Sequence, residues 1–367
     1  MRVPFLDLQA SYKEIQSDLD GAALRGLGSG WYIGGPEVEG FEQAFASYCQ
    51  VKHCVAVANG LEALQLGLLA AGVEPGDEVV VPAHTFIATW LAVTECGAIP
   101  VPVDIDSATY TLDPSRLADA FTSRTKAVVP VHLYGLPADI YAILAISAEH
   151  GVAVVEDAAQ AHGARSRGRR IGSHGAAAAW SFYPGKNLGA FGDAGAVTTN
   201  DSGLAAQLRL RRNYGSSVKY VHEVQGRNSR LDPIQAALLR VKLAHLDAWN
   251  ARRQMIARQY LTELAGTGVV LPVVPAWAEP VWHLFCVRHP RRDAFREALR
   301  MAGVEPLIHY PIPPHLQAAY AGLGITAGAF PTAEETASTI LSLPIGPAMT
   351  EAQVDAVIAA VKATARD

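Results

Sequence analysis

Short apolar segments alternate with helix-length segments through the first two thirds of this chain, and this alternation constrains the fold more than any other feature. Strands are expected at seven places: 54–58, 78–81, 99–103, 126–131, 152–155, 176–182 and 195–199. Helices are expected between them at 61–71, 85–96 and 139–150. Strands this apolar, separated by helices, indicate an α/β fold with a mostly parallel central sheet that helices sandwich on both faces.

The pattern changes after residue 230. Apolar residues recur at helical spacing over 231–264, which predicts a long connecting helix, continuous or with one break. Four further elements are expected after it: a strand near 282–287, a helix near 293–302, a strand near 306–308 and a helix near 351–363. A chain of 367 residues at about 150 residues per domain suggests two domains. We expect a large domain over 1–240, including an N-terminal arm, and a small α+β domain over 241–367.

Composition excludes several classes of protein. Half of the residues are apolar and 18% are charged, so the chain is not intrinsically disordered. Thirty basic residues against 35 acidic ones leave no surplus positive charge for a nucleic-acid backbone. No apolar run reaches the 18 residues typical of a membrane span, and none of signal-peptide type follows Met1. We therefore expect a cytoplasmic protein that binds neither nucleic acid nor membrane.

Cysteine and histidine give no metal or disulfide signature. The four cysteines, at positions 49, 54, 96 and 286, form no C-x-x-C pair and are expected to be small buried side chains. The 12 histidines are scattered, and none pairs at zinc-binding spacing beside a glutamate. We expect no metal site.

Two glycine motifs resemble phosphate-binding loops only superficially. Gly26, Gly28 and Gly30 follow a helical pattern rather than a strand, so we interpret 26–30 as a flexible loop. Gly185-Lys186 would suit a P-loop, but Trp180 stands where that motif needs glycine and Asn187 where it needs Ser or Thr. We exclude both.

Lys186 is the lysine with the least ordinary context. Only seven of the 30 basic residues are lysines, and the other six lie in helical or loop contexts typical of a solvated charge. Lys186 follows the predicted strand 176–182 and a Tyr-Pro-Gly turn, at the sheet edge where open α/β folds bind ligands. A partly desolvated amine there becomes a nucleophile toward carbonyl groups. The alternative is a surface lysine in a turn.

Asp157 ends the predicted strand 152–155, on an element next to that of Lys186. A carboxylate at a buried strand end needs a cationic partner, and a protonated pyridine nitrogen is one such partner. Pyridoxal phosphate (PLP) chemistry combines a Schiff-base lysine with a carboxylate at the ring nitrogen. The alternative is that Asp157 caps a helix over 158–162.

A phosphate cradle is expected where a strand meets a helix at Asn59-Gly60-Leu61. Glycine lets the backbone approach an anion, and the first N–H groups of the helix point toward it. Ser181 offers a hydroxyl for the same anion. Phe86, at the opening of the predicted helix 85–96, either stacks on a cofactor ring or is an ordinary core aromatic.

Together these residues resemble the sugar-nucleotide aminotransferases of the DegT/DnrJ/EryC1/StrS group, which are fold-type-I PLP enzymes. The resemblance covers nearly the whole chain, from residue 3 to residue 344. Its most specific segments are 156–163 (EDAAQAHG), 181–187 (SFYPGKN) and 226–230 (GRNSR). It implies the fold-type-I architecture, with PLP as the cofactor and pyridoxamine phosphate as its intermediate form.

The resemblance also implies a role for each cofactor-binding position. Lys186 would hold the cofactor covalently and act as the proton shuttle. Asp157 would pair with the pyridine nitrogen and Gln160 with the ring hydroxyl. The phosphate would be held by Gly60, Leu61, Ser181 and, from a second subunit, Asn228. The active site would then be shared across a homodimer.

The cradle departs from the Ser-Gly-Thr of much of the group. Its Asn59-Gly60-Leu61, with the segment 309–315 (HYPIPPH), resembles the branch that aminates C3 of dTDP-3-oxo-6-deoxyhexoses with L-glutamate as donor. In that branch Tyr183, His309 and Tyr310 match positions near the sugar.

Two basic residues and the reaction itself leave alternatives open. Lys219 either meets the substrate phosphates or is a solvated loop residue, and Arg230 either orients the donor carboxylate or braces the subunit interface. The alternative reactions are amination of C4 on a dTDP- or UDP-4-keto-6-deoxyhexose, or no turnover at all in a PLP-bound regulator.

Overall fold

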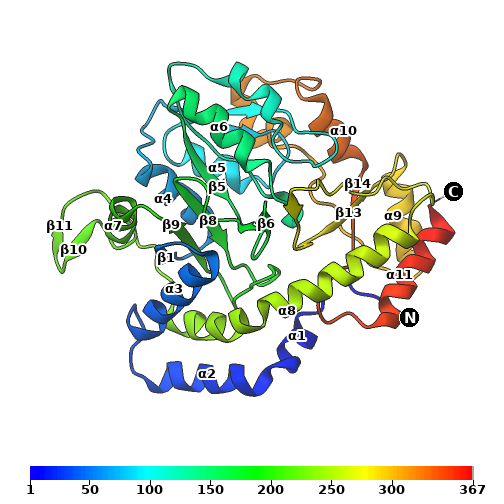
Figure 1. Ribbon diagram of the computed structural model, residues 1–367, viewed down its shortest axis with the longest axis horizontal. Helices are drawn as coiled ribbons and strands as arrows, with labels where there is room; N and C mark the ends of the chain where they lie inside the picture. Colours follow the sequence, from blue (N-terminus) through cyan, green and yellow to red (C-terminus); the bar gives the residue numbers. More distant parts are fainter. Residues whose placement is uncertain (366–367) are drawn as a thin grey trace.

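A seven-stranded sheet crosses the molecule in the order β1-β9-β8-β5-β4-β2-β3 (Figure 1). The computed structural model describes residues 1–365. The strands are β1 His53–Val57, β2 Glu78–Pro82, β3 Ile99–Val103, β4 Thr125–Val128, β5 Ala153–Asp157, β8 Ala177–Ser181 and β9 Gly195–Thr199. Only β9 runs antiparallel to its neighbours, β1 and β8. The predicted α/β fold with a mostly parallel sheet is confirmed.

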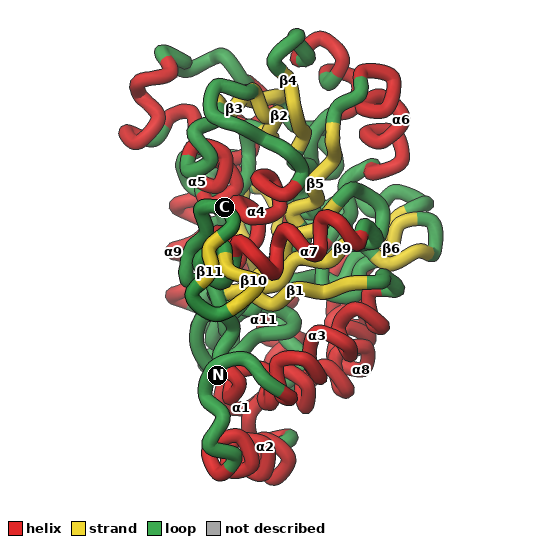
Figure 2. Tube along the Cα trace, turned by 90° about the vertical axis from the view of Figure 1, so that its left-hand side faces the viewer, coloured by secondary structure: helices red, strands yellow, loops and turns green. Residues whose placement is uncertain are grey.

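Helices cover both faces of this sheet, which Figure 2 shows running from β3 and β2 down to β1. One face packs against α4 Gly60–Ala70, α5 Ala88–Thr94 and α7 Ser202–Arg211. The other packs against α3 Pro36–Cys49, α6 Ile140–His150 and α8 Pro233–Glu263. Side chains along β1 point alternately to the two faces. Val55 and Val57 enter the first core, while Cys54 and Ala56 enter the second, so both faces of the sheet are apolar and need cover.

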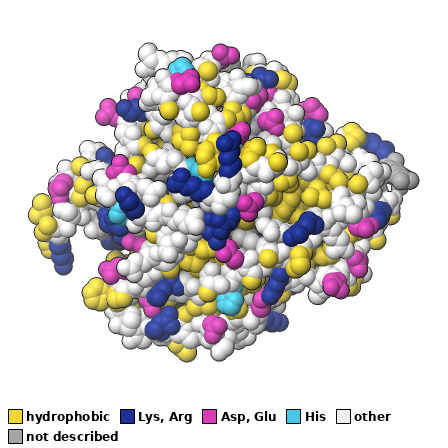
Figure 3. Space-filling model, in the orientation of Figure 1, with side chains coloured by type: hydrophobic (Ala, Val, Ile, Leu, Met, Phe, Trp, Pro, Cys, Tyr) yellow, Lys and Arg dark blue, Asp and Glu magenta, His cyan; other side chains and the backbone are white. Residues whose placement is uncertain are grey.

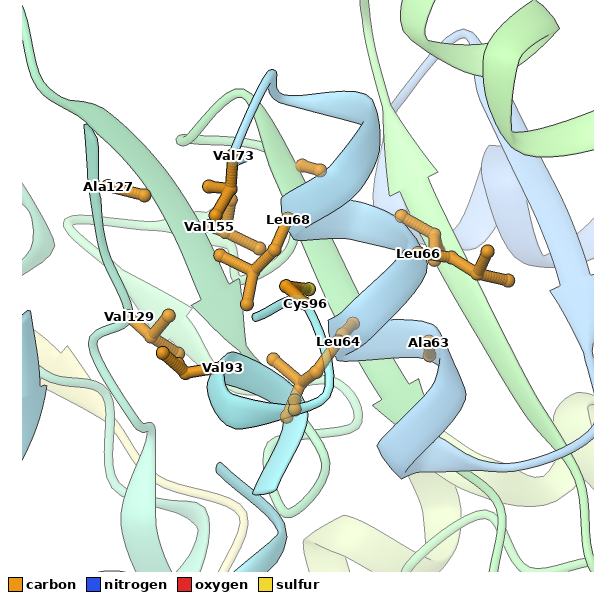
Figure 4. Packing of buried hydrophobic residues seen from close by; sticks show 14 of the residues in the cluster. Ala63, Leu64, Leu66, Leu68, Val73, Val93, Cys96, Ala127, Val129 and Val155 are labelled. Carbon is orange, nitrogen blue, oxygen red and sulfur yellow. The ribbon is translucent and has the colours of Figure 1, made fainter. Parts of the chain in front are cut away.

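The first core is built from aliphatic side chains of α4, α5 and the sheet (Figure 4). Leu64 and Leu68 of α4 point toward Val155 of β5 and Val93 of α5. Cys96 lies among them and is free and buried, as are the other three cysteines, Cys49, Cys54 and Cys286. The cysteines therefore act as small core residues, as the sequence predicts.

Two short helices precede this layer, α1 Leu8–Glu14 and α2 Gln16–Gly28. The interpretation of 26–30 as a flexible loop is wrong for Gly26 and Gly28, which lie inside α2. Gly26 packs against α8, where an added Cβ would stand 3.7 Å from Ile234 Cα. Close helix packing, rather than flexibility, explains this glycine. Gly30 follows the helix with a positive φ of 70°.

The C-terminal part forms a third core against the second half of α8. Its elements are β13 Phe285–Arg288, α9 Arg292–Met301, α10 Pro331–Thr339, β14 Ile340–Leu343 and α11 Glu351–Thr364. β13 and β14 pair antiparallel. The α8 helix runs without a break through residue 240, where the sequence places a domain boundary.

The strand expected near 306–308 is wrong. Only an isolated bridge forms there, in which Leu307 exchanges two backbone hydrogen bonds with Ser342 of β14. Pro306 has no N–H to extend the pairing.

Two small sheets were not anticipated from sequence. A hairpin of β10 Ser216–Val218 and β11 Val221–His222 projects at the left of Figure 1. A three-stranded sheet joins β6 Arg165–Ser166, β7 Arg169–Arg170 and β12 Ala278–Glu279. Strands of two or three residues carry too little periodicity to be recognised.

Within residues 1–365, no helix has the length and apolarity that crossing a bilayer requires. The same residues contain no cluster of three or more His, Cys, Asp or Glu side chains suited to a metal ion.

A fully buried carboxylate anchors the end of β5. Glu156 accepts a 3.1 Å hydrogen bond from His132 Nε2. The ring of His132 carries its proton there because Nδ1 accepts from the Ala138 N–H. The two Glu156 oxygens also accept from three backbone N–H groups, those of Gly172, His174 and Gly175. Burial acts to raise the pKa of Glu156, but the hydrogen bonds from His132 and His174 outweigh it, so its pKa is lowered.

The substitution Glu156→Gln is expected to lower the free energy of unfolding at pH 7 by about 3 kcal/mol. Because the pKa of Glu156 is depressed in the folded state, its contribution is complete above the unfolded value of 4.5 and is lost as pH falls below it. The difference between wild type and variant should therefore shrink below pH 4.5. Urea unfolding at several pH values measures it, with the exposed Glu149→Gln of α6 as the control. A difference that grows on acidification would contradict this assignment.

Candidate active site

The neighbouring strands β5 and β8 bring Asp157 and Lys186 to one edge of the sheet. Asp157 pairs in register with Ala179, and Lys186 follows β8 after a turn. A cavity of about 720 Å³ opens at this edge. Most of the predicted site residues line it: Asn59, Gly60, Leu61, Phe86, Asp157, Gln160, Ser181, Tyr183, Lys186, His309 and Tyr310. Lys186 and Asp157 thus lie together at the carboxyl ends of neighbouring strands, the edge at which open α/β folds bind ligands.

The turn that presents Lys186 is held tightly. The Lys186 N–H donates to the Tyr183 carbonyl at 2.8 Å. Gly189 closes the turn, since a Cβ there would lie 2.3 Å from the Pro184 oxygen. Asn187 is buried, and its Nδ2 donates to Asn250 Oδ1 and to the Val281 carbonyl, both at 2.9 Å. Lys186 is thus fixed at its backbone while its side chain enters the cavity.

Burial lowers the pKa of the Lys186 amine to about 8, against the opposing influence of Asp157. A substantial fraction is then neutral near physiological pH and nucleophilic. Lys242 corrects the expectation that the other lysines are solvated. It is largely buried on α8, donates to the Gly189 carbonyl, and has its pKa lowered to about 8 by burial.

Asp157 is buried and accepts two hydrogen bonds, from Thr89 Oγ1 at 2.9 Å and from the Ala159 N–H at 3.2 Å. Burial raises its pKa, against the lowering effects of these two donors and of Lys186. Within the described chain Asp157 forms no salt bridge, so its carboxylate is free to pair with a cation in the cavity. No helix follows at 158–162, which removes the helix-cap interpretation.

Phe86 precedes the helix in which it was expected. The predicted helix 85–96 begins at Ala88, and Thr85 and Phe86 lie in the preceding turn. The Thr85 hydroxyl lies 2.9 Å from the Thr89 hydroxyl, which in turn donates a hydrogen bond to the Asp157 carboxylate. This turn therefore supports the carboxylate, and it leaves Phe86 at the cavity with 51% of its surface exposed.

Gln160 joins the strand end to the segment 309–310. Its Oε1 accepts from the Tyr134 N–H at 2.6 Å, and its Nε2 donates to the Tyr310 hydroxyl at 3.1 Å. Tyr134 in turn donates from its hydroxyl to the His309 carbonyl. One amide thus fixes both Tyr310 and, through Tyr134, the backbone of His309.

His309 and Tyr310 present their rings to the same cavity. The His309 Nδ1 lies 2.9 Å from Ser342 Oγ. Burial, with a smaller contribution from Lys186, lowers the pKa of His309 to about 4, so the ring is neutral at pH 7. The Tyr310 and Phe86 ring centroids lie 5.3 Å apart. Phe86, His309 and Tyr310 together form an aromatic wall of the cavity, with polar atoms at its edges.

The N-terminus of α4 forms an open cradle. Asn59 caps the helix by accepting from the Glu62 N–H at 2.9 Å. Gly60 lies directly on Ser181, where an added Cβ would come within 2.5 Å of the serine Cβ. Within the described residues, the N–H groups of Gly60 and Leu61 donate to no protein acceptor. A helix start with free N–H groups is suited to an anion.

Three residues singled out by sequence lie outside the cavity of this chain. Lys219 is exposed between β10 and β11, on the projecting hairpin where hydrophobic and basic side chains gather at the left of Figure 3. Asn228 is exposed and bridges Asn213. Arg230 donates to the same Asn213 and lies 5.5 Å from the Tyr214 ring centroid. The structure does not bring them to Lys186.

Thr89, Arg253 and His283 are among the cavity residues that the sequence did not predict. Thr89 could have been found as the residue one helical turn after Thr85. Arg253 stands in a polar stretch of a long helix, which is typical of a solvated face. His283 is half-buried, and its Nδ1 lies 3.3 Å from Asn187 Oδ1. Neither has a local signal, because each reaches the cavity only through the folding of distant segments.

Comparison with known proteins identifies the family of this chain. Residues 13–362 match the DegT/DnrJ/EryC1/StrS aminotransferase family. The chain belongs to this family. It is 58% identical over 366 residues to the erythromycin biosynthesis sensory transduction protein EryC1 of Saccharopolyspora erythraea, covering 100% of both chains. It is 56% identical to dTDP-3-amino-3,4,6-trideoxy-alpha-D-glucose transaminase of Streptomyces venezuelae, covering 98% of this chain and 96% of that one.

Two solved structures share the whole fold of this chain. S. venezuelae DesV, in complex with a ketimine intermediate, superposes with a TM-score of 0.98 at 55% identity, covering 100% of this chain and 99% of that one. NtdA from Bacillus subtilis, with bound cofactor PMP, superposes with a TM-score of 0.92 at 31% identity, covering 100% and 86%. The family predicted from the sequence, and the aminotransferase fold that goes with it, are confirmed.

Proposed function

We propose that this chain is a PLP-dependent transaminase that moves an amino group from L-glutamate to the 3-keto carbon of a dTDP-3-oxo-6-deoxyhexose. The products are a dTDP-3-amino-3,6-dideoxyhexose and 2-oxoglutarate. The observation that carries the proposal is the shared cavity of Lys186 and Asp157, with the α4 cradle at its edge. An amine of lowered pKa, a buried unpaired acid and an anion cradle are the three groups that this cofactor needs.

The residues present fit the cofactor at each of its polar groups. Gly60, Leu61 and Ser181 would hold the phosphate, since the cradle has free N–H groups and a hydroxyl. Asp157 would pair with the pyridine nitrogen, which supplies the cation that its buried carboxylate lacks. Gln160 would bond the ring hydroxyl, and Phe86 would stack on the ring.

PLP, when bound, supplies an electron sink for the carbanion formed at the carbon that gives or receives the amino group. Lys186 would hold PLP covalently and then, as a free amine, move the proton at that carbon. Its pKa of about 8 suits both tasks, because the amine exchanges a proton readily near neutral pH. Asp157 would keep the proton on the ring nitrogen, and Thr89 and Ala159 fix the orientation of its two oxygens.

The sugar nucleotide is inferred from the aromatic wall and from the relatives. Tyr183, His309 and Tyr310 would contact the sugar, because they line the cavity beside Lys186. The S. venezuelae transaminase, 56% identical, is named for a dTDP-3-amino sugar. The cavity draws on both domains that we propose, 1–240 through Lys186 and 241–367 through His309. A dTDP-sugar and L-glutamate are metabolites of the cytoplasm, where we place the reaction.

A homodimer would complete the site. Asn228 and Lys219 lie outside the cavity of their own chain, which suits a role in the cavity of a second copy. There Asn228 would reach the cofactor phosphate and Lys219 the substrate phosphates. Trp31, Tyr32 and Ile33 are more than half exposed, and the dimer would bury such an apolar segment.

The alternatives are C4 amination and a PLP-bound regulator without turnover. The name of the S. venezuelae relative favours C3 over C4. EryC1 carries a name that denotes sensory transduction. A purely regulatory role, however, has no need of a proton-transfer amine beside a ring-nitrogen acid, and this chain retains both.

Lys186→Ala is expected to abolish the absorbance of covalently bound PLP and to reduce turnover by about 10³-fold or more. Purified protein is assayed with L-glutamate and either a 3-keto or a 4-keto dTDP-sugar, and 2-oxoglutarate is measured. The exposed Lys52→Ala serves as the matched control. Turnover of the 4-keto sugar alone would favour C4 amination. A PLP absorbance that glutamate does not change would favour the regulator.

Gly60→Ala is expected to raise the dissociation constant for PLP about tenfold, because the new Cβ would push the α4 N-terminus away from Ser181. Fluorescence titration of the cofactor-free protein with PLP measures this. Gly21→Ala is the matched control, since a Cβ there meets no atom within 4 Å. PLP affinity equal to that of wild type in the Gly60 variant would rule out this cradle.

A further inference from the structure

Arg253 is a buried cation with no role in the reaction proposed above. It lies in the second half of α8, is only 4% exposed, and lines the same cavity as Lys186 and Asp157. Its Nη1 lies within hydrogen-bond distance of three backbone carbonyls, those of Trp282 at 3.2 Å, His283 at 3.4 Å and Ile345 at 3.0 Å. These contacts hold one corner of the guanidinium against the C-terminal part of the chain.

The charge of Arg253 has no counter-ion in the described chain. None of the salt-bridged carboxylates pairs with it, and Asp157 instead accepts from Thr89 and Ala159. Burial lowers the pKa of Arg253 to about 10, so it stays charged near neutral pH. A buried charge of this kind is costly unless an anion pairs with it. Carbonyl dipoles offset part of that cost, and an anionic ligand would offset the rest.

The free side of the guanidinium has the right shape for a carboxylate. Nε and Nη2 donate to no group of residues 1–365, and neither is among the fully enclosed polar atoms without a partner. They therefore keep some exposed surface, in a residue that lines the cavity. These two N–H groups are parallel, which is the geometry of a bidentate bond to a carboxylate.

Among the cavity-lining side chains of the described residues, the strong cations are Lys186 and Arg253. Lys186 is engaged in the reaction itself. Desolvation, and after it the charges of Lys186 and Arg253, lower the pKa of His283. The His283 carbonyl also accepts from Arg253 Nη1, so the two cations act on one region of the cavity. A donor carboxylate attached to the reacting carbon would have to lie in that region.

We propose that Arg253 binds the α-carboxylate of the amino donor. This rests on the proposed transamination and assigns its donor subsite. Arg253 then recognises a 2-amino acid by its carboxylate and plays no part in binding the keto sugar. It would orient the donor so that the α-proton faces Lys186 Nζ. Arg230, which the sequence offers for this role, lies outside the cavity of its own chain.

A structural role is the competing explanation, because Arg253 also clamps Trp282, His283 and Ile345. The two roles differ in what they predict for the two halves of the reaction. A clamp would disturb the whole cavity, so that donor and keto sugar would be affected alike. A donor-carboxylate site would affect the step with L-glutamate and leave the step with the keto sugar unchanged.

The test uses PLP-loaded Arg253→Gln and Arg253→Lys proteins. The matched control is the neighbouring Arg252→Gln, since Arg252 is partly exposed, pairs with Glu14 and does not line the cavity. Rapid mixing follows the loss of the PLP absorbance with L-glutamate and, separately, its return with the keto sugar. Calorimetry with α-methyl-L-glutamate, which has no α-proton to lose, measures donor binding without turnover. We expect both Arg253 variants to bind this probe about 30-fold or more weakly than wild type. The keto-sugar step should keep the wild-type rate.

A second measurement tests which carboxylate is bound. Wild type is expected to prefer L-glutamate strongly over 4-aminobutyrate, which lacks the α-carboxylate, and Arg253→Gln should lose most of that preference. A preference equal to that of wild type would overturn the assignment. So would an equal loss in both half-reactions in both Arg253 variants, since a clamp alone explains it. Failure of the wild-type protein to react with glutamate would instead count against the proposed function.

Discussion

The site depends on one electrostatic arrangement, a buried amine and a buried carboxylate that share a cavity without forming a salt bridge in the described chain. Burial lowers the pKa of Lys186 and raises that of Asp157, so neither charge is fully satisfied by the protein alone. A cofactor with an aldehyde and a basic ring nitrogen satisfies both. The parallel order of β5 beside β8 makes the arrangement possible, because it delivers both segments to one sheet edge.

Much of the surrounding structure holds these two groups in place. Glu156 anchors the end of β5 through four N–H donors, while Thr89 and Ala159 orient Asp157 itself. Asn187 fixes the turn beside Lys186. Gln160 extends this support to the sugar side, since it bonds both Tyr134 and Tyr310. Binding of the cofactor ring and placement of the aromatic wall are therefore coupled through the Gln160 amide.

The sequence predicted the sheet and the paired groups because both depend on local patterns. The strands expected at 99–103 and 195–199 have the observed bounds. Asp157 ends β5, and Lys186 follows the adjacent β8 after a turn. The sequence-based predictions failed where tertiary contacts determine the environment of a residue. Gly26 packs on α8, Phe86 lies in a turn that serves Asp157, and Lys242 is buried. Arg253 reaches the cavity from a helix that looks solvent-facing in sequence, so only the assembled fold shows it.

The central claim is that Asp157 holds a proton on the ring nitrogen of the bound cofactor. The most direct test is ¹⁵N NMR of the protein loaded with PLP labelled at that nitrogen. We expect a protonated nitrogen in wild type at pH 8 and an unprotonated one in Asp157→Asn. An unprotonated nitrogen in wild type, or an unchanged signal in the variant, would contradict it.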